Sequence, residues 1–125
     1  MKQKIILFAS GNGSNVENIC HFFEHVPKVE IAGVYTNNSS AGVIQRLEPL
    51  GLQVEVFDRN VFQDGTLLSQ IQCKQPTLIV LAGFLWKIGQ DWVRAFPDTI
   101  VNIHPALLPK YGGKGMYGQH VHQAV

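Results

Sequence analysis

Five short aliphatic runs, separated by stretches with helical spacing, constrain the fold of this chain more than any other feature. Runs this short and this apolar are typical of strands that helices cover on both faces. Helical crossovers between such strands are right-handed and give parallel pairing. We therefore expect an α/β fold with a doubly wound, mostly parallel five-stranded sheet, whose strands span residues 5–9, 29–35, 54–57, 78–82 and 100–103.

Apolar residues spaced three or four apart predict four helices between these strands. The residues that define the helices are Val16, Ile19, Cys20 and Phe23; Ile44 and Leu47; Leu67, Leu68 and Ile71; and Ile88, Trp92, Val93 and Phe96. After Pro105 the sequence has four glycines and little periodicity. We expect a long functional loop there.

Length and charge limit the classes of partner. A chain of 125 residues, 46% of them hydrophobic, fits one domain with its own core, which we place at residues 1–125. A formal net charge of +1 lacks the basic excess of proteins that bind nucleic acid or anionic membranes. We therefore expect a small-molecule partner, no nucleic acid and no membrane.

The N-terminus and the cysteines point to an intracellular protein. The first apolar run is too short for a signal peptide and ends in polar residues, so we expect a cytoplasmic location. Cys20 and Cys73 lack the spacing of a disulfide framework or a thiolate metal site. We expect both to be buried free thiols.

The loop after the first strand, "SGNGSN", has the composition of a phosphate site. Gly11 and Gly13 allow a tight turn, and Ser14 or Asn15 can cap a helix whose first N–H groups favour an anion. Val16 stands where a dinucleotide fingerprint needs a glycine, and no acid follows the second strand. No P-loop lysine follows either. An ordinary capped turn accounts for this loop as well as phosphate binding does.

Asn102 and His104 lie at the end of the fifth strand, where period-two alternation puts them on one face. An amide donor beside an imidazole suits a reaction in which a carbonyl oxygen becomes negative while an amine loses a proton. The alternative is a histidine satisfied near the core and an asparagine in a turn.

The segment after the fourth strand, "LAGFLWKIG", is unusually apolar for a loop. Leu85, Trp86 and Ile88 form a surface on which a flat heteroaromatic ligand could lie. Core packing onto the next helix is the alternative.

Taken together, "SGNGSN", "LAGF" and "NIHPALLPKY" resemble the glycinamide ribonucleotide formyltransferases, folate-dependent enzymes of Rossmann-like fold in purine synthesis. The resemblance implies that the loop binds the phosphate of glycinamide ribonucleotide. It also implies that the later segment and an arginine bind the folate of the cosubstrate 10-formyltetrahydrofolate, although Trp86 and Lys87 depart from a commoner Met-Arg-Ile-Leu version. The implied phosphate residues are Gly11, Asn12, Gly13, Ser14 and Asn15; the implied folate residues are Arg59, Leu85, Trp86, Lys87, Ile88 and Asn102.

The resemblance further implies a mechanism. The substrate amine attacks the formyl carbon, and Asn102 with protonated His104 stabilises the tetrahedral oxyanion before the folate amine leaves. His120 matches a histidine near the family site. No metal and no covalent intermediate are needed. A metal site of His104, His120 and His122 is the weaker interpretation, since no carboxylate or cysteine ligand lies near them.

Two features depart from the family. Residues 112–118 form a longer, glycine-rich segment that suggests a flap, and no aspartate follows Asp98 to serve as the family's catalytic aspartate. We expect the C-terminal part of the family fold to be absent, which leaves apolar surface for self-association, a homodimer included. A formyltetrahydrofolate deformylase and a non-catalytic nucleotide-binding module are the alternative functions, and the "GNGSN" loop argues against the deformylase.

Overall fold

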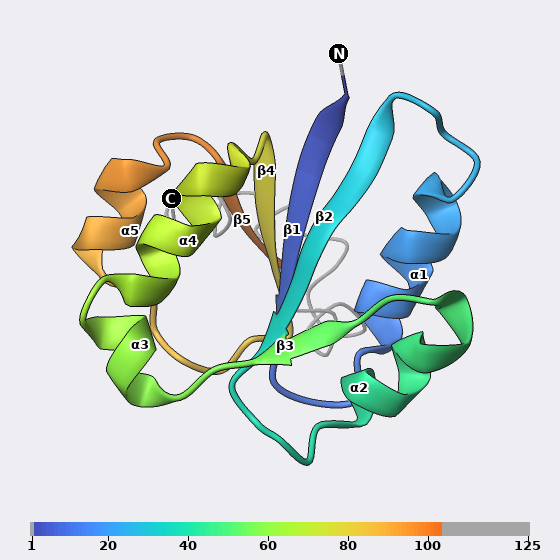
Figure 1. Ribbon diagram of the computed structural model, residues 1–125, viewed down its shortest axis with the longest axis horizontal. Coiled ribbons are helices and arrows are strands. Elements are labelled where there is room, and N and C mark those ends of the chain that lie inside the picture. Colours follow the sequence, from blue (N-terminus) through green and yellow to red (C-terminus); the bar gives the residue numbers. More distant parts are fainter. Residues whose placement is uncertain (1, 104–125) are drawn as a thin grey trace, which may run out of the picture.

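A five-stranded parallel sheet lies at the centre of the protein in the computed structural model, which describes residues 2–103 (Figure 1). The strands are ordered β3-β2-β1-β4-β5, and every neighbouring pair is parallel. Their bounds are β1 (Gln3–Ala9), β2 (Val29–Thr36), β3 (Val54–Val56), β4 (Leu78–Ala82) and β5 (Ile100–Ile103). The predicted α/β fold is confirmed. The predictions for His104, His120, His122 and the segment 112–118 lie outside the described residues.

Helices cover both faces of this sheet. Figure 1 shows α1 and α2 on one face and α3, α4 and α5 on the other. Their bounds are α1 (Ser14–Phe23), α2 (Gly42–Leu47), α3 (Arg59–Gln63), α4 (Thr66–Lys74) and α5 (Gln90–Ala95), with a short 3-10 helix, η1 (Glu48–Leu50), after α2. The arrangement is the doubly wound one that the alternating sequence pattern predicts.

Strand β1 is the centre of the core because it contributes to both faces. Ile6 and Phe8 pack with residues of α3, α4 and α5 into a cluster that we call the aromatic cluster. Its aromatic members are Phe8, Tyr35, Phe57, Phe62, Phe84, Trp92 and Phe96. Ile5 and Leu7 pack into an aliphatic cluster with residues of α1 and α2. Side chains of a strand alternate between the faces, so a central strand covered on both faces needs an uninterrupted apolar run.

Three local predictions are corrected. Helix α3 was not expected; it begins after Asp58, whose carboxylate accepts a hydrogen bond from the Val61 N–H at 3.0 Å. Ile88 lies before α5 rather than within it. Cys20 is a buried free thiol as predicted, but Cys73 is exposed, because it lies on α4 away from the face that Leu67 and Ile71 bury.

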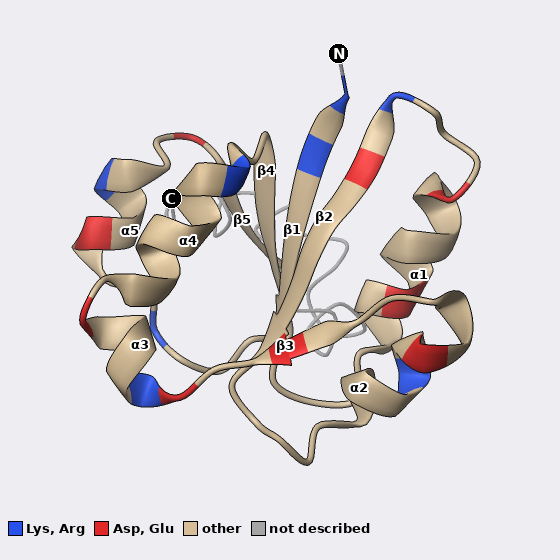
Figure 2. Cartoon of the chain, viewed as in Figure 1, with Lys and Arg blue, Asp and Glu red and all other residues tan. Residues whose placement is uncertain are grey.

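Charged residues are interspersed over the surface. In the view of Figure 2, acidic and basic residues are scattered over the helices, strands and loops of the described part, and neither sign is confined to one side. Within residues 2–103, no helix combines the length and apolarity that crossing a membrane requires.

Candidate functional site

The loops after β1 and β4 lie side by side at the carboxyl edge of the sheet. The Ser10 N–H donates to the Gly83 carbonyl at 3.2 Å, and the Ser10 hydroxyl accepts from the Leu85 N–H at 2.9 Å. Ser10 is only 6% exposed, so its own side of both bonds is shielded from water. Ligands of open parallel sheets bind at this edge, and the structure therefore brings together two of the three segments that the sequence singled out.

Gly13 fixes the turn into α1. Its φ of +77° lies in the left-handed region, and a Cβ there would overlap the side chain of Val43. Gly13 is also the N-cap of α1, so the expected capping by Ser14 or Asn15 is wrong. The side chain that bonds an N–H group at the start of this helix is that of Asn12, whose side-chain oxygen accepts from the Ser14 N–H at 3.0 Å.

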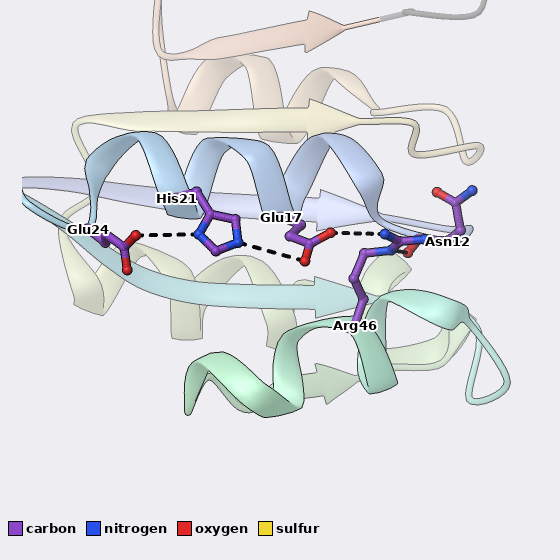
Figure 3. A network of polar contacts seen from close by, with 5 residues as sticks. All are labelled: Asn12, Glu17, His21, Glu24 and Arg46. Carbon is purple, nitrogen blue, oxygen red and sulfur yellow. Dashed lines mark hydrogen bonds and ion pairs between the residues drawn. The ribbon is translucent and has the colours of Figure 1, made fainter.

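Helix α2 holds this loop from outside. The Val43 N–H donates to the Gly11 carbonyl at 3.1 Å. The Arg46 side chain donates through Nε to the Asn12 carbonyl at 2.7 Å and through Nη1 to Glu17 Oε1 at 2.9 Å (Figure 3). Arg46 was missed in the sequence because it lies 34 residues from Asn12, and no local pattern marks it.

Arg59 at the start of α3 and Trp86 in the loop after β4 are brought together. The Arg59 Cζ lies 4.1 Å from the centroid of the Trp86 ring, within the range of a cation–π contact. Trp86 is half-buried against the aromatic cluster, with its ring centroid 5.4 Å from that of Phe62. Both residues are among those that the resemblance assigned to folate.

The loop after β4 divides into a core part and a surface part. Phe84 is buried in the aromatic cluster, as the core-packing alternative predicts for it. Leu85 is 82% exposed, and Lys87 is exposed beside it. An apolar side chain this exposed next to Trp86 is available to a ligand.

Asn102 lies on β5 opposite Leu81 of β4. Its side-chain oxygen is buried and has no hydrogen-bond partner among residues 2–103. The same holds for the side-chain oxygen of Asn37, which directly follows β2. Buried amides are normally hydrogen-bonded, so both oxygens are candidates for contacts with a ligand or with residues beyond the described part. The sequence pattern did not single out Asn37 as a site residue.

The groups with the largest pKa shifts lie in the core. Burial, and then the charge of Glu17, raises the pKa of Cys20 to about 11. Burial, and then Glu55, raises the pKa of Tyr35 to about 12.

Tyr35 also lines a hollow of about 460 Å³ beside β3, and none of the predicted site residues lines this hollow. No cluster of three metal-ligating side chains occurs within residues 2–103.

The parallel sheet, the glycine turn into α1 and the polar residues at the carboxyl edge define a doubly wound α/β protein, a class whose members bind their ligands at this edge of the sheet. Residues 3–125 match the formyl transferase family, and the chain belongs to that family. The predicted resemblance is thereby confirmed.

Two similar curated proteins are phosphoribosylglycinamide formyltransferases. The chain is 34% identical to the chloroplastic phosphoribosylglycinamide formyltransferase of Arabidopsis thaliana, a match that covers 99% of this chain and 45% of the relative. It is 31% identical to phosphoribosylglycinamide formyltransferase of Escherichia coli K12, over 87% of this chain and 54% of the relative. The chain thus spans about half the length of these curated relatives. Since the plant relative is chloroplastic, the cytoplasmic location stays a prediction.

A solved structure shows the same fold. Phosphoribosylglycinamide formyltransferase from Brucella melitensis superposes with a TM-score of 0.77 at 28% identity, over 98% of this chain and 65% of that one.

Proposed function

We propose that this chain takes part in transferring a formyl group from 10-formyltetrahydrofolate to the amine of glycinamide ribonucleotide. The observation that carries the proposal is the pair of hydrogen bonds through Ser10 that joins the glycine loop to the loop after β4. A transfer between two substrates needs their sites to adjoin, and these loops are the ones assigned to nucleotide and folate. The names of the relatives support the same reaction.

The phosphate would bind over Gly11, Asn12, Gly13, Ser14 and Asn15, at the start of the ten-residue helix α1. The backbone N–H groups at a helix start point outward, and the helix dipole favours an anion there. The Ser14 N–H is already bonded to Asn12, which leaves the neighbouring N–H groups to receive the phosphate.

The folate would bind along Leu85, Trp86, Lys87 and Ile88, with the Arg59 guanidinium over the Trp86 ring. The exposure of Leu85 fits an apolar contact with a flat ring. Arg59 is exposed on α3 and can pair with the carboxylates of a folate tail.

Asn102 and His104 would carry the chemistry. The Asn102 amide donates to the oxygen of the tetrahedral intermediate, and protonated His104 offsets its charge, with His120 beside them. The tetrahedral intermediate collapses as the bond between the formyl carbon and the folate nitrogen breaks, the attacking amine loses a proton, and the folate amine leaves, with no covalent bond to the protein. The Asn102 side-chain oxygen, buried and without a hydrogen-bond partner among residues 2–103, is available to accept from the attacking substrate amine while the amide N–H donates to the oxyanion. We place the whole site on one domain, residues 1–125, and a homodimer remains part of the proposal.

Calorimetric titration with glycinamide ribonucleotide and with a 10-formyl folate analogue, together with a formyl-transfer assay, tests this proposal. We expect both ligands to bind. Binding of neither would overturn the proposal, and nucleotide binding without transfer would favour a non-catalytic nucleotide-binding module. Release of formate without the nucleotide would favour a deformylase. In active protein, His104→Ala should lower the transfer rate far more than the nucleotide affinity.

A further inference from the structure

Arg46 joins three elements around the glycine loop. It lies on α2, bonds the Asn12 carbonyl of the loop at 2.7 Å, and bonds Glu17 in the first turn of α1 at 2.9 Å. Figure 3 shows both contacts, with His21 on the other side of Glu17. A planar guanidinium can satisfy two acceptors at once because its N–H groups point in fixed, separate directions.

The bond to Asn12 sets the direction of the following N–H group. In a trans peptide the carbonyl and the next N–H point in opposite directions. With the Asn12 carbonyl held toward α2, the Gly13 N–H points away from α2, and no residue among 2–103 accepts from it. Val43 acts on the preceding peptide in the same way, since its N–H holds the Gly11 carbonyl.

The bond to Glu17 removes an electrostatic conflict. A carboxylate in the first turn of a helix repels an anion bound at that helix start. The Glu17 side chain is 29% exposed, so water screens it only in part. Arg46 neutralises this carboxylate, and its side chain, 38% exposed, is turned toward protein acceptors.

We propose that Arg46 is a positioning residue for the nucleotide phosphate, an inference that rests on the proposed function. Arg46 does not touch the phosphate. It fixes the Asn12–Gly13 peptide so that the Gly13 N–H faces the ligand, and it cancels the charge of Glu17. Neither role was evident from the sequence, and both depend on one side chain of a different helix.

Four variants separate these roles. Arg46→Gln removes the charge and most of the hydrogen-bonding reach, while Arg46→Lys keeps the charge without the planar fork. Arg46→Gln leaves the Glu17 carboxylate without its cation, and the double variant Arg46→Gln with Glu17→Gln removes that carboxylate as well. Arg94→Gln is the matched control, because Arg94 is an exposed arginine on α5 bonded to Gln90 at 3.1 Å, outside this network.

Affinities are measured for glycinamide ribonucleotide and for the same compound without its phosphate. Arg46→Gln should weaken binding of the nucleotide roughly tenfold, as loss of one charge-assisted hydrogen bond predicts, and change binding of the riboside less than about twofold. The Glu17→Gln addition should restore part of the loss, and Arg46→Lys should fall in between. Arg94→Gln should match the wild type.

Backbone amide spectra of the full chain give a second readout. Inorganic phosphate should shift the Gly13 amide of the wild type, and the shift should shrink in Arg46→Gln. Wild-type protein that binds neither nucleotide nor phosphate would refute the proposed function itself. The positioning role alone would be refuted if the wild type binds the nucleotide and Arg46→Gln keeps the same ratio of nucleotide affinity to riboside affinity. If Arg46→Gln does not fold, Arg46→Lys decides: equal affinity for the nucleotide would overturn the proposal.

Discussion

The hydroxyl oxygen of Ser10 accepts a hydrogen bond from the backbone N–H of Leu85, 75 residues further along the chain, at 2.9 Å. The bond joins the loop after β1 to the loop after β4 where these neighbouring parallel strands end. Ser10 therefore holds the two loops together in addition to beginning the turn after β1. It sets how far apart the two loops stand, and hence how far the nucleotide and folate parts of the proposed site are from each other.

Ser10→Ala should lower the free energy of unfolding by about 1 kcal/mol, because the Leu85 N–H loses its partner in a partly buried hydrogen bond. Folate affinity should fall more than nucleotide affinity, since Leu85 is the residue released. Denaturant unfolding and ligand titration measure both effects. Ser69→Ala, on the exposed side of α4, is the control: it should leave both affinities unchanged and should not lower the free energy of unfolding, since alanine favours a helix. An equal loss of both affinities would contradict a local effect on the β4 loop.

Gly13→Ala should be among the most damaging substitutions in the loop. The left-handed φ and the overlap with Val43 together predict a loss of about 2 to 4 kcal/mol of unfolding free energy. Gly65→Ala separates the two causes, because Gly65 has a φ of +91° but open space around its Cβ position. It should cost about 1 kcal/mol. Equal costs for the two variants would show that the Val43 contact contributes nothing.

A double-mutant cycle tests the same contact directly. Val43→Ala alone creates a cavity. Combined with Gly13→Ala it removes only the contact with Val43 Cγ2, because the Cβ and Cα of residue 43 would still lie 2.5 and 2.8 Å from the added Cβ. The two changes should therefore cost less together than the sum of their separate costs, by the part of the strain that Cγ2 contributes. Strict additivity would place the strain in the left-handed backbone and in the contacts with the Cβ and Cα of Val43.

The sequence predicted the parts of the fold that local patterns determine. The run at Ile5–Ala9 marks a central strand because burial on both faces leaves no room for a polar residue. The five-residue helix α3 was not predicted, because it is too short to show the 3.6-residue spacing of apolar side chains. The role of Arg46 escaped for a different reason: its partners are 29 and 34 residues away, and only the packing of α2 beside α1 brings them together.

The contact between Arg59 and Trp86 should contribute about 0.5 to 1 kcal/mol, the range for a partly exposed cation–π pair. Arg59→Gln, Trp86→Leu and the double variant give this coupling energy from denaturant unfolding. Both single variants should also weaken binding of a folate analogue and leave nucleotide affinity unchanged. Lys28→Gln, an exposed charge at the opposite edge of the sheet, is the control. Wild-type folate affinity in Arg59→Gln, in Trp86→Leu and in the double variant would show that the pair is not part of the folate site.

Cys20 should make the protein less stable in alkali. Its pKa is raised by burial from 9.0 to about 11, so the folded state keeps its proton above the pH at which the unfolded thiol ionises. The unfolded state then binds fewer protons, and stability falls as pH rises from 9 through about 11. Cys20→Ala should flatten this part of the profile of unfolding free energy against pH, whereas Cys73→Ala should not. An identical slope in all three proteins would contradict the assignment.

Asn102→Leu should leave stability unchanged or raise the free energy of unfolding by up to about 1 kcal/mol, since it removes a buried oxygen that has no partner among residues 2–103. The same change should lower the formyl-transfer rate by about 100-fold or more, as loss of an oxyanion donor predicts, with nucleotide affinity retained. A residue that weakens the fold and serves the reaction is expected where function opposes stability. Val101→Ile, on the other face of β5, should change neither rate nor affinity. If Asn102→Leu instead destabilised the protein and kept its rate, the amide would be a structural group bonded by residues after Ile103.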